Sequence, residues 1–187
     1  MIVGLGNPGS QYEQTRHNAG FWFLDRLAKD YHATLRAESK FHGSVVKAII
    51  HGRDVWLLQP NTFMNLSGQS IAALSNFYKI TPEQILVVHD ELDLPPGTIR
   101  LKQGGGHGGH NGLRDTINKL GSKMFARLRI GIGHPGDKSR VHDYVLHRAG
   151  QDDQIAIDLA IQNAIDEIDL IVSGDWDKAM NRLHTKN

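Results

Sequence analysis

The chain begins with MIVGLGNPG at residues 1–9, an apolar run that stops in a turn rich in glycine and proline. A short apolar run bounded by turn residues predicts a buried strand, here over residues 1–5. After a polar loop, apolar side chains recur at helical spacing and predict a helix over residues 19–32. Because strands that alternate with amphipathic helices are typical of α/β domains, this opening favours an α/β fold.

The rest of the chain continues the alternation. We expect a hairpin from residues 45–50 and 55–58, a helix capped by Ser67, strands at 85–89, 98–102 and 127–132, and a helix from Leu113 to about Gly121. Residues 134–150 are polar and predict a mobile, lid-like surface connection. Residues 151–184 predict C-terminal helices that are divided at Gly174. We find no internal repeat, and we predict one domain over residues 1–187.

Charge is distributed unevenly along the chain. The 187 residues include 21 Lys and Arg and 20 Asp and Glu, so the formal net charge is only +1. Such a balance argues against a simple nucleic-acid binder, which usually has a strong basic excess. Residues 98–148, however, hold 10 basic and 3 acidic residues, whereas residues 151–187 hold 3 basic and 8 acidic ones. The split predicts a localised basic face that the total conceals.

Composition excludes several classes of site. Cysteine is absent, so the chain forms no disulfide, zinc–thiolate site or cysteine nucleophile. No apolar run approaches the roughly 18 residues that a membrane helix needs. The N-terminal apolar run is too short for a secretory signal, and we therefore expect a cytoplasmic protein with no membrane partner.

The glycines at positions 4, 6 and 9 match the G-x-G-x-x-G pattern of a dinucleotide site. A dinucleotide site needs a helix that begins at this turn, so that the helix N-terminus can bind the pyrophosphate. Residues 10–17 show little apolar periodicity and therefore do not predict such a helix. A P-loop is also disfavoured, because Ser10-Gln11 stands where Lys-Ser/Thr is required. A tight turn alone leaves Asn7 unexplained, and its amide is well placed to hydrogen-bond a ligand. A dinucleotide-dependent oxidoreductase remains the least favoured of the alternative functions.

His17 lies in a loop just before a predicted helix, where catalytic residues are common. A catalytic imidazole needs an acceptor that orients its second nitrogen. The best candidate is Asp90, which ends a hydrophobic strand. The alternatives are that His17 is an ordinary packed or surface histidine, and that residues 90–93 form a solvated or metal-binding acidic turn.

Residues 104–112 hold six of the 20 glycines, and they precede a helix N-terminus that favours anions such as phosphate. His107 and His110 within this segment leave a metal site as an alternative. Residues 62–68 predict either a plain helix cap or a turn with a ligand-facing Asn65. No G-x-S-x-G motif is present, so a serine hydrolase mechanism of that kind is disfavoured.

Together these segments resemble one family, bacterial peptidyl-tRNA hydrolase. The resemblance rests on Tyr12, Lys102 and the segments VGLGNPG (3–9), TRHNAG (15–20), TFMNLSG (62–68), HDELD (89–93), GGGHGGHNG (104–112) and RLRIGIG (127–133). These motifs cover nearly the whole chain in order. The resemblance implies a single α/β domain with a mixed twisted β-sheet sandwiched by helices, which works as a monomer without metal or other cofactor.

The resemblance also implies an activity: hydrolysis of the ester between a peptide and the 3′-terminal ribose of tRNA, which recycles tRNA from prematurely released peptidyl-tRNA. His17 matches the base that activates water, Asp90 the residue that orients it, and Asn7 the residue that helps to distinguish blocked from free aminoacyl-tRNA. The remaining matches are substrate or tRNA contacts (Tyr12, Phe63, Asn65, Asn111), walls of the site (Met64, His110) and cations for tRNA phosphate (Lys102, Arg129).

The chemistry of these residue types agrees with that activity. Neutral imidazole is a suitable base near pH 7, and Asn amides can hold a peptide group. The expected partner is peptidyl-tRNA, contacted along its acceptor stem and 3′ CCA end, and this polyanion accounts for the basic residues 98–148. The main alternative is a non-enzymatic RNA-binding protein, although binding alone needs no His17–Asp90 pair.

Overall fold

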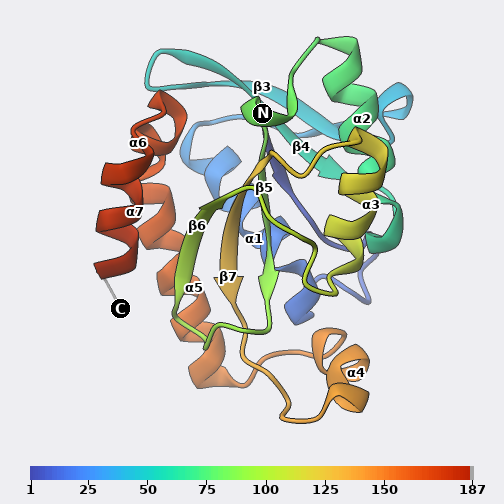
Figure 1. Ribbon diagram of the computed structural model, residues 1–187, viewed down its shortest axis with the longest axis vertical. Coiled ribbons are helices and arrows are strands. Elements are labelled where there is room, and N and C mark those ends of the chain that lie inside the picture. The colour runs from blue at the N-terminus through green and yellow to red at the C-terminus, as the bar shows by residue number, and fades with distance from the viewer. Residues whose placement is uncertain (186–187) are drawn as a thin grey trace.

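A computed structural model describes residues 1–185 as one α/β domain, in which a seven-stranded mixed sheet lies between two layers of helices (Figure 1). The strands are β1 (Ile2–Gly4), β2 (Arg36–Glu38), β3 (Gly43–Ile50), β4 (Arg53–Pro60), β5 (Leu86–Glu91), β6 (Ile99–Gln103) and β7 (Ala126–Gly131). The α-helices are α1 (Ala19–Asp30), α2 (Ser67–Phe77), α3 (Asn111–Leu120), α4 (Val141–Val145), α5 (Gln151–Asp166), α6 (Ile168–Ser173) and α7 (Trp176–Thr185). The predicted fold class is confirmed.

The strand order β2-β3-β4-β1-β5-β7-β6 places the first strand of the chain in the middle of the sheet. Strands β4, β1, β5 and β7 are parallel neighbours, and β2, β3 and β6 add antiparallel pairs at the two edges. The carboxyl ends of the four parallel strands therefore share one edge of the sheet. In open α/β sheets, ligands bind in the crevice beyond this edge.

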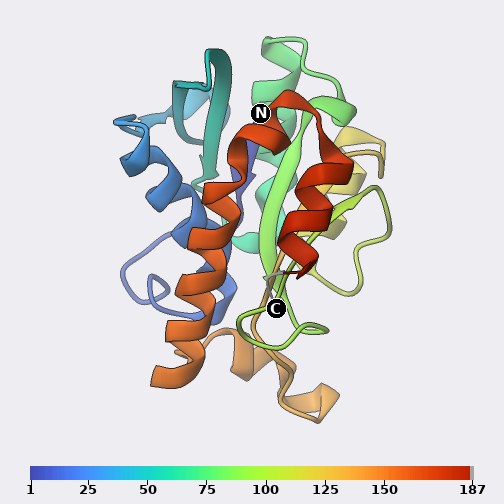
Figure 2. The same cartoon turned by 90° about the vertical axis from the view of Figure 1, so that its left-hand side faces the viewer.

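Two hydrophobic cores cover the two faces of the sheet. Helices α1, α5, α6 and α7 pack on one face, and α2 and α3 pack on the other. Side chains alternate between the cores, so that Ile2 contributes to the first and Val3 to the second. The views in Figures 1 and 2 place α5–α7, which carry the acidic C-terminal residues, on the opposite side of the sheet from α3.

The start of α1 lies directly against the carboxyl ends of β1 and β5. A Cβ atom on Gly20 would lie 2.4 Å from the Val88 carbonyl oxygen, and one on Gly4 would lie 2.3 Å from the Gly20 carbonyl oxygen. Real Cβ atoms do not approach so closely, so glycine is required at both positions. This close packing brings the residues just before α1, including His17, to the end of β5.

The structure corrects three details of the sequence interpretation. Ser67 is the first residue of α2 rather than its cap, because its hydroxyl donates to the Met64 carbonyl oxygen (2.7 Å). The apolar stripe before Gly174 predicted one continuous helix, whereas the structure has two, α5 and α6, which are separated at Glu167. Glu167 forms an ion pair with Arg182 (3.0 Å). Residues 134–150 contain a short helix, α4. No helix within residues 1–185 is long and apolar enough to cross a membrane.

Candidate active site

His17 and Asp90 meet at the carboxyl edge of the sheet. His17 lies in a 3-10 turn (Arg16–Asn18) before α1, and Asp90 is near the end of β5. The His17 Nδ1 atom is 3.0 Å from Asp90 Oδ1 and 2.9 Å from Asp90 Oδ2. The other ring nitrogen, Nε2, has no hydrogen-bond partner within the described part of the chain. The pairing predicted from the sequence is therefore present.

A second imidazole, His110, contacts the same carboxylate. His110 is the N-cap of α3, and its Nδ1 atom accepts hydrogen bonds from the backbone N–H groups of Gly112 (3.1 Å) and Leu113 (3.3 Å). A nitrogen that accepts carries no proton, so the proton of the neutral ring is on Nε2. This Nε2–H donates to Asp90 Oδ1 over 2.8 Å. The helix N-terminus thus fixes the tautomer of His110.

The cluster of His17, Asp90 and His110 has a defined charge state. Burial opposes ionisation of Asp90, but the two imidazoles that donate to it hold the pKa of this carboxyl well below its usual range. Burial also opposes protonation of His17. The negative charge of Asp90 and its hydrogen bond outweigh that effect, and the pKa of His17 is raised above 6.5. Neutral His17 donates through Nδ1, which leaves a lone pair on Nε2.

The same cluster contains three residues of types that can bind a metal ion. His17, Asp90 and His110 each offer a ligand atom, and these atoms lie within 4.8 Å of one another. A metal would need an unprotonated nitrogen from each imidazole. Because the two nitrogens that face Asp90 both carry the protons of its hydrogen bonds, these residues fit a hydrogen-bonded cluster rather than a metal centre. His107, the other histidine of the Gly-rich segment, accepts from Gly109 N (2.9 Å).

Asn7 follows the carboxyl end of β1, at the same edge of the sheet, with its amide oriented. Its Oδ1 atom accepts from the backbone N–H of Met64 (2.7 Å), and its backbone exchanges two hydrogen bonds with the buried side chain of Asn18 (2.8 and 3.0 Å). The NH₂ group of Asn7 has no hydrogen-bond partner among residues 1–185. The hydrogen bond to the oxygen therefore fixes the orientation of the amide, with the NH₂ group as its free donor end.

The predicted contact residues lie in the loop after β1, in the turn before α2 and at the start of α3. The rings of Tyr12 and Phe63 meet edge to face, with centroids 6.3 Å apart, and Phe63 is 55% exposed. Asn65 is exposed in the turn before α2. Asn111 follows His110 at the start of α3, where its Oδ1 accepts from Arg114 (3.1 Å). Among the described residues, no hydrogen bond joins these side chains to the His17 cluster, so their role as substrate contacts stays a prediction.

The two predicted phosphate-binding cations lie on the sheet face covered by α2 and α3. Cross-strand pairs between β6 and β7 set Lys102 opposite Arg127 and Arg100 opposite Arg129, which puts all four cations on one face. Like charges directly opposite each other are unfavourable, so this face is suited to an anion. Arg129 also donates to Glu91 Oε1 (2.8 Å), an ion pair that the sequence interpretation missed.

Sequence reasoning also missed three buried polar residues. His89 is fully buried beside Asp90, and its Nδ1 contacts the Asp90 carbonyl oxygen (2.7 Å). Burial, followed by the nearby His110, lowers the pKa of His89 to about 3, so this ring is neutral. Asn18 and Arg127 are the other two. The alternation of side chains in the predicted strand 127–132 could have identified Arg127, because it places Arg127 on the same face of the sheet as Arg129.

A segment predicted as a mobile connection contacts the loop that carries His17. Arg16 donates to the carbonyl oxygens of Tyr144 (2.9 Å) and His147 (3.3 Å), and its guanidinium lies 3.8 Å from the centroid of the Tyr144 ring. The end of α4 is thereby attached next to His17. Its lid-like movement stays a prediction.

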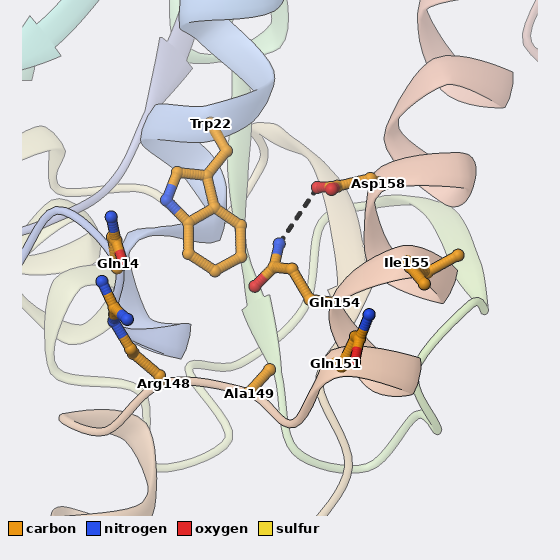
Figure 3. A pocket seen from close by; sticks show the side chains of 8 residues that line it. All are labelled: Gln14, Trp22, Arg148, Ala149, Gln151, Gln154, Ile155 and Asp158. Atoms are coloured by element: carbon orange, nitrogen blue, oxygen red, sulfur yellow. Dashed lines mark hydrogen bonds between the residues drawn. The ribbon is translucent and has the colours of Figure 1, made fainter.

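A hollow of about 570 Å³ lies elsewhere, between α1 and the start of α5 (Figure 3). Trp22, Gln14 and Arg148 line one side of it, and Gln154, which hydrogen-bonds Asp158 (3.0 Å), lines the other. None of the predicted site residues contributes to its wall. The oriented groups of the crevice, rather than hollow size, therefore identify the candidate active site.

Fold and site together define a class: a single-domain α/β enzyme with a histidine–carboxylate pair at the carboxyl edge of a mixed sheet. The family model described as peptidyl-tRNA hydrolase matches residues 1–187. A peptidyl-tRNA hydrolase of Xanthomonas campestris pv. campestris is 60% identical over 185 residues, covering 99% of this chain and 96% of the relative. One of Shewanella halifaxensis is 56% identical over 186 residues, covering 99% and 96%.

Solved structures give the same result. The crystal structure of peptidyl-tRNA hydrolase from Acinetobacter baumannii has a TM-score of 0.96 and 56% identity, over 98% of this chain and 93% of that one. The chain belongs to the peptidyl-tRNA hydrolase family.

Proposed function

We propose that this protein hydrolyses the ester that joins a peptide to the 3′-terminal ribose of tRNA, and so returns tRNA from prematurely released peptidyl-tRNA. The observation that carries the proposal is the His17–Asp90 pair, which occupies His17 Nδ1 and leaves Nε2 without a hydrogen-bond partner among residues 1–185. Membership of the family supports the activity.

His17 acts as the general base. As a water oxygen attacks the ester carbonyl, its proton moves to His17 Nε2, and the ionised Asp90 stabilises the imidazolium that forms. When the bond between the carbonyl carbon and the ribose oxygen breaks, the same proton passes to that oxygen. The products are the peptide acid and tRNA with a free hydroxyl. An ester is activated enough for this route to need no covalent intermediate.

Asn7 selects substrates with a blocked amino group. Its oxygen already accepts from Met64 N, which fixes the amide so that the NH₂ group is the end without a partner among residues 1–185. A peptide or N-acyl group brings a carbonyl oxygen that can accept from this NH₂. The free ammonium of aminoacyl-tRNA is itself a donor and would leave both groups unpaired. Sites that mismatch a polar group in this way discriminate strongly.

The tRNA lies over the basic face. Lys102 and Arg129 hold phosphates of the acceptor stem, and the 3′ CCA end enters the crevice past Phe63 and Tyr12, whose rings offer stacking surfaces. Asn65, Asn111 and Met64 contact the terminal nucleotide or the peptide. The protein acts as a monomer in the cytoplasm, on the free tRNA conjugate.

The decisive experiment compares N-acetyl-aminoacyl-tRNA with free aminoacyl-tRNA as substrates of the purified protein. Selective release of the acyl group from the first is expected. Equal rates on both would contradict the role of Asn7. Tight tRNA binding without release from either would favour an RNA-binding protein instead.

A further inference from the structure

Arg127 is a buried cation that none of the roles above uses. It lies on β7 and is only 2% exposed, with its guanidinium 4.5 Å from the centroid of the Phe125 ring. Burial, followed by repulsion from Arg129, lowers the pKa of Arg127. A buried cation without a compensating contact is costly, so its partners show what it does.

Those partners are backbone carbonyl groups: two lie in the Gly-rich segment (residues 104–112), and a third, more distant one is that of Lys123 (3.5 Å). The two terminal nitrogens of Arg127 donate to the carbonyl oxygens of Gly105 and Gly106. Gly105 has a φ of +116°, a conformation that only glycine adopts readily. A segment so rich in glycine has many alternative conformations, and the planar fork of Arg127 selects one of them.

The segment held in this way supports Lys102. A Cβ atom on Gly105 would lie 3.0 Å from Lys102 Nζ, so the Lys102 ammonium rests directly on the backbone that Arg127 holds. The far end of the segment is fixed separately, because His110 caps α3 and donates to Asp90. Arg127 therefore controls the Lys102 side of the segment more than the His17 side.

We propose that Arg127 is a positioning residue for tRNA binding: its two hydrogen bonds hold Gly105 and Gly106 so that Lys102 projects toward the tRNA phosphates. Its burial prevents direct contact with tRNA. The proposal rests on the proposed function for the identity of the anion. It predicts a loss of tRNA affinity with an unchanged chemical step.

The test compares Arg127→Lys and Arg127→Met with the wild-type protein. Lysine keeps the charge but cannot bond both carbonyls in a planar fork. Both variants are expected to raise KM for N-acetyl-aminoacyl-tRNA and Kd for deacylated tRNA about tenfold, the effect of misplacing one charge-assisted contact. The kcat value and its pH profile should stay unchanged. Wild-type affinity in Arg127→Lys would overturn the proposal.

A double-mutant cycle separates positioning from a general charge effect. If Arg127 acts through Lys102, the Arg127→Met and Lys102→Ala effects on Kd will not add. Additive effects would overturn the proposal. The matched control is Arg26→Met on the opposite sheet face, where Arg26 also donates to a backbone carbonyl, that of Asp158 (3.4 Å). This variant should bind tRNA normally.

Gly105→Ala provides a second route if Arg127→Met does not fold. It disturbs the same backbone while Arg127 is intact, and it should raise Kd to a similar extent with kcat preserved. Normal tRNA binding by Gly105→Ala would contradict the proposal. Because Kd for deacylated tRNA needs no turnover, these results remain interpretable if the wild-type protein fails to cleave N-acetyl-aminoacyl-tRNA.

Discussion

Two parts of the candidate site differ in how firmly their side chains are held. In the His17 cluster, the side chains of His17, Asp90 and His110 are 13%, 2% and 10% exposed, and each carboxylate oxygen accepts a hydrogen bond. At the proposed tRNA-binding rim, which includes Phe63, Lys102 and Arg129, Phe63 is 55% exposed and Lys102 is also exposed. The proposed site thus combines a fixed centre with an open rim.

The difference follows from what each part has to do. Proton transfer needs a base held in one orientation, because small displacements reduce the rate steeply. Binding of a polyanion depends on several weak contacts, and an enzyme must release tRNA after each turnover. We therefore expect substitutions in the cluster to lower kcat by large factors and substitutions at the rim to change KM modestly.

The largest effect is expected from His17→Ala. Removal of the base should lower kcat by about 10³-fold, within the range attributed to a positioned general base, while Kd for tRNA stays within about twofold. Single-turnover assays and tRNA binding measured in parallel test both parts. The control His51→Asn changes an exposed histidine in the β3–β4 turn. Near-normal turnover in His17→Ala would exclude it as the base.

Asp90→Asn should have the next largest effect, about 10²-fold on kcat, because the neutral amide no longer stabilises the imidazolium. The pH profile gives a second readout. A base works when neutral, so the wild-type rate should rise with pH through the raised pKa of His17, above 6.5. The substitution would remove the negative charge of Asp90, the larger of the two influences that raise this pKa, and leave burial, which lowers it. The rise should move to lower pH, and an unmoved profile would contradict the pairing.

Arg129 and Lys102 test the rim. Lys102→Ala should raise Kd for tRNA about tenfold and lower the slope of log K against log salt by about one, as expected for one lost phosphate contact. Arg129→Ala should raise Kd for tRNA further, because it leaves Glu91 as an unpaired negative charge on the same face. An unchanged salt slope in both variants would place the tRNA elsewhere.

Glu91→Gln should act in the opposite direction. Loss of its charge frees Arg129 for phosphate and should tighten tRNA binding by about two- to threefold, the scale of a partly exposed ion pair. Fluorescence titration at low and high salt would measure this change. Weaker binding would show that Glu91 orients Arg129 rather than competing with tRNA.

The smallest effect is expected from Phe63→Leu. Leucine keeps apolar area but loses the stacking face, so KM should rise by about threefold, the lower part of the range for a base–aromatic stack, with kcat unchanged. If kcat falls as far as in Asp90→Asn, the distinction between fixed centre and open rim is wrong.

The sequence predicted much of the fold because its elements carry strong local signals. The apolar runs at residues 1–5 and 85–89 and the helix ending at Gly121 all appear in the structure. The short strand β2 carries no such signal, since all three of its residues are exposed. At the division between α5 and α6, Glu167 pairs with Arg182, 15 residues away, a contact that no local pattern reveals.

By itself, the sequence determined the α/β class and the family. It also predicted Asn7, His17 and Asp90 as the centre of the site, because each stands in a motif at the end of a strand or the start of a helix. Only the tertiary structure decided that His110 shares the Asp90 carboxylate, that Glu91 neutralises Arg129, and that Arg127 holds the Gly-rich segment. These contacts join residues that are 20 to 38 positions apart along the chain. Sheet pairing and helix capping bring the residues together and so set their hydrogen-bond partners and tautomers. Local sequence patterns do not encode such contacts.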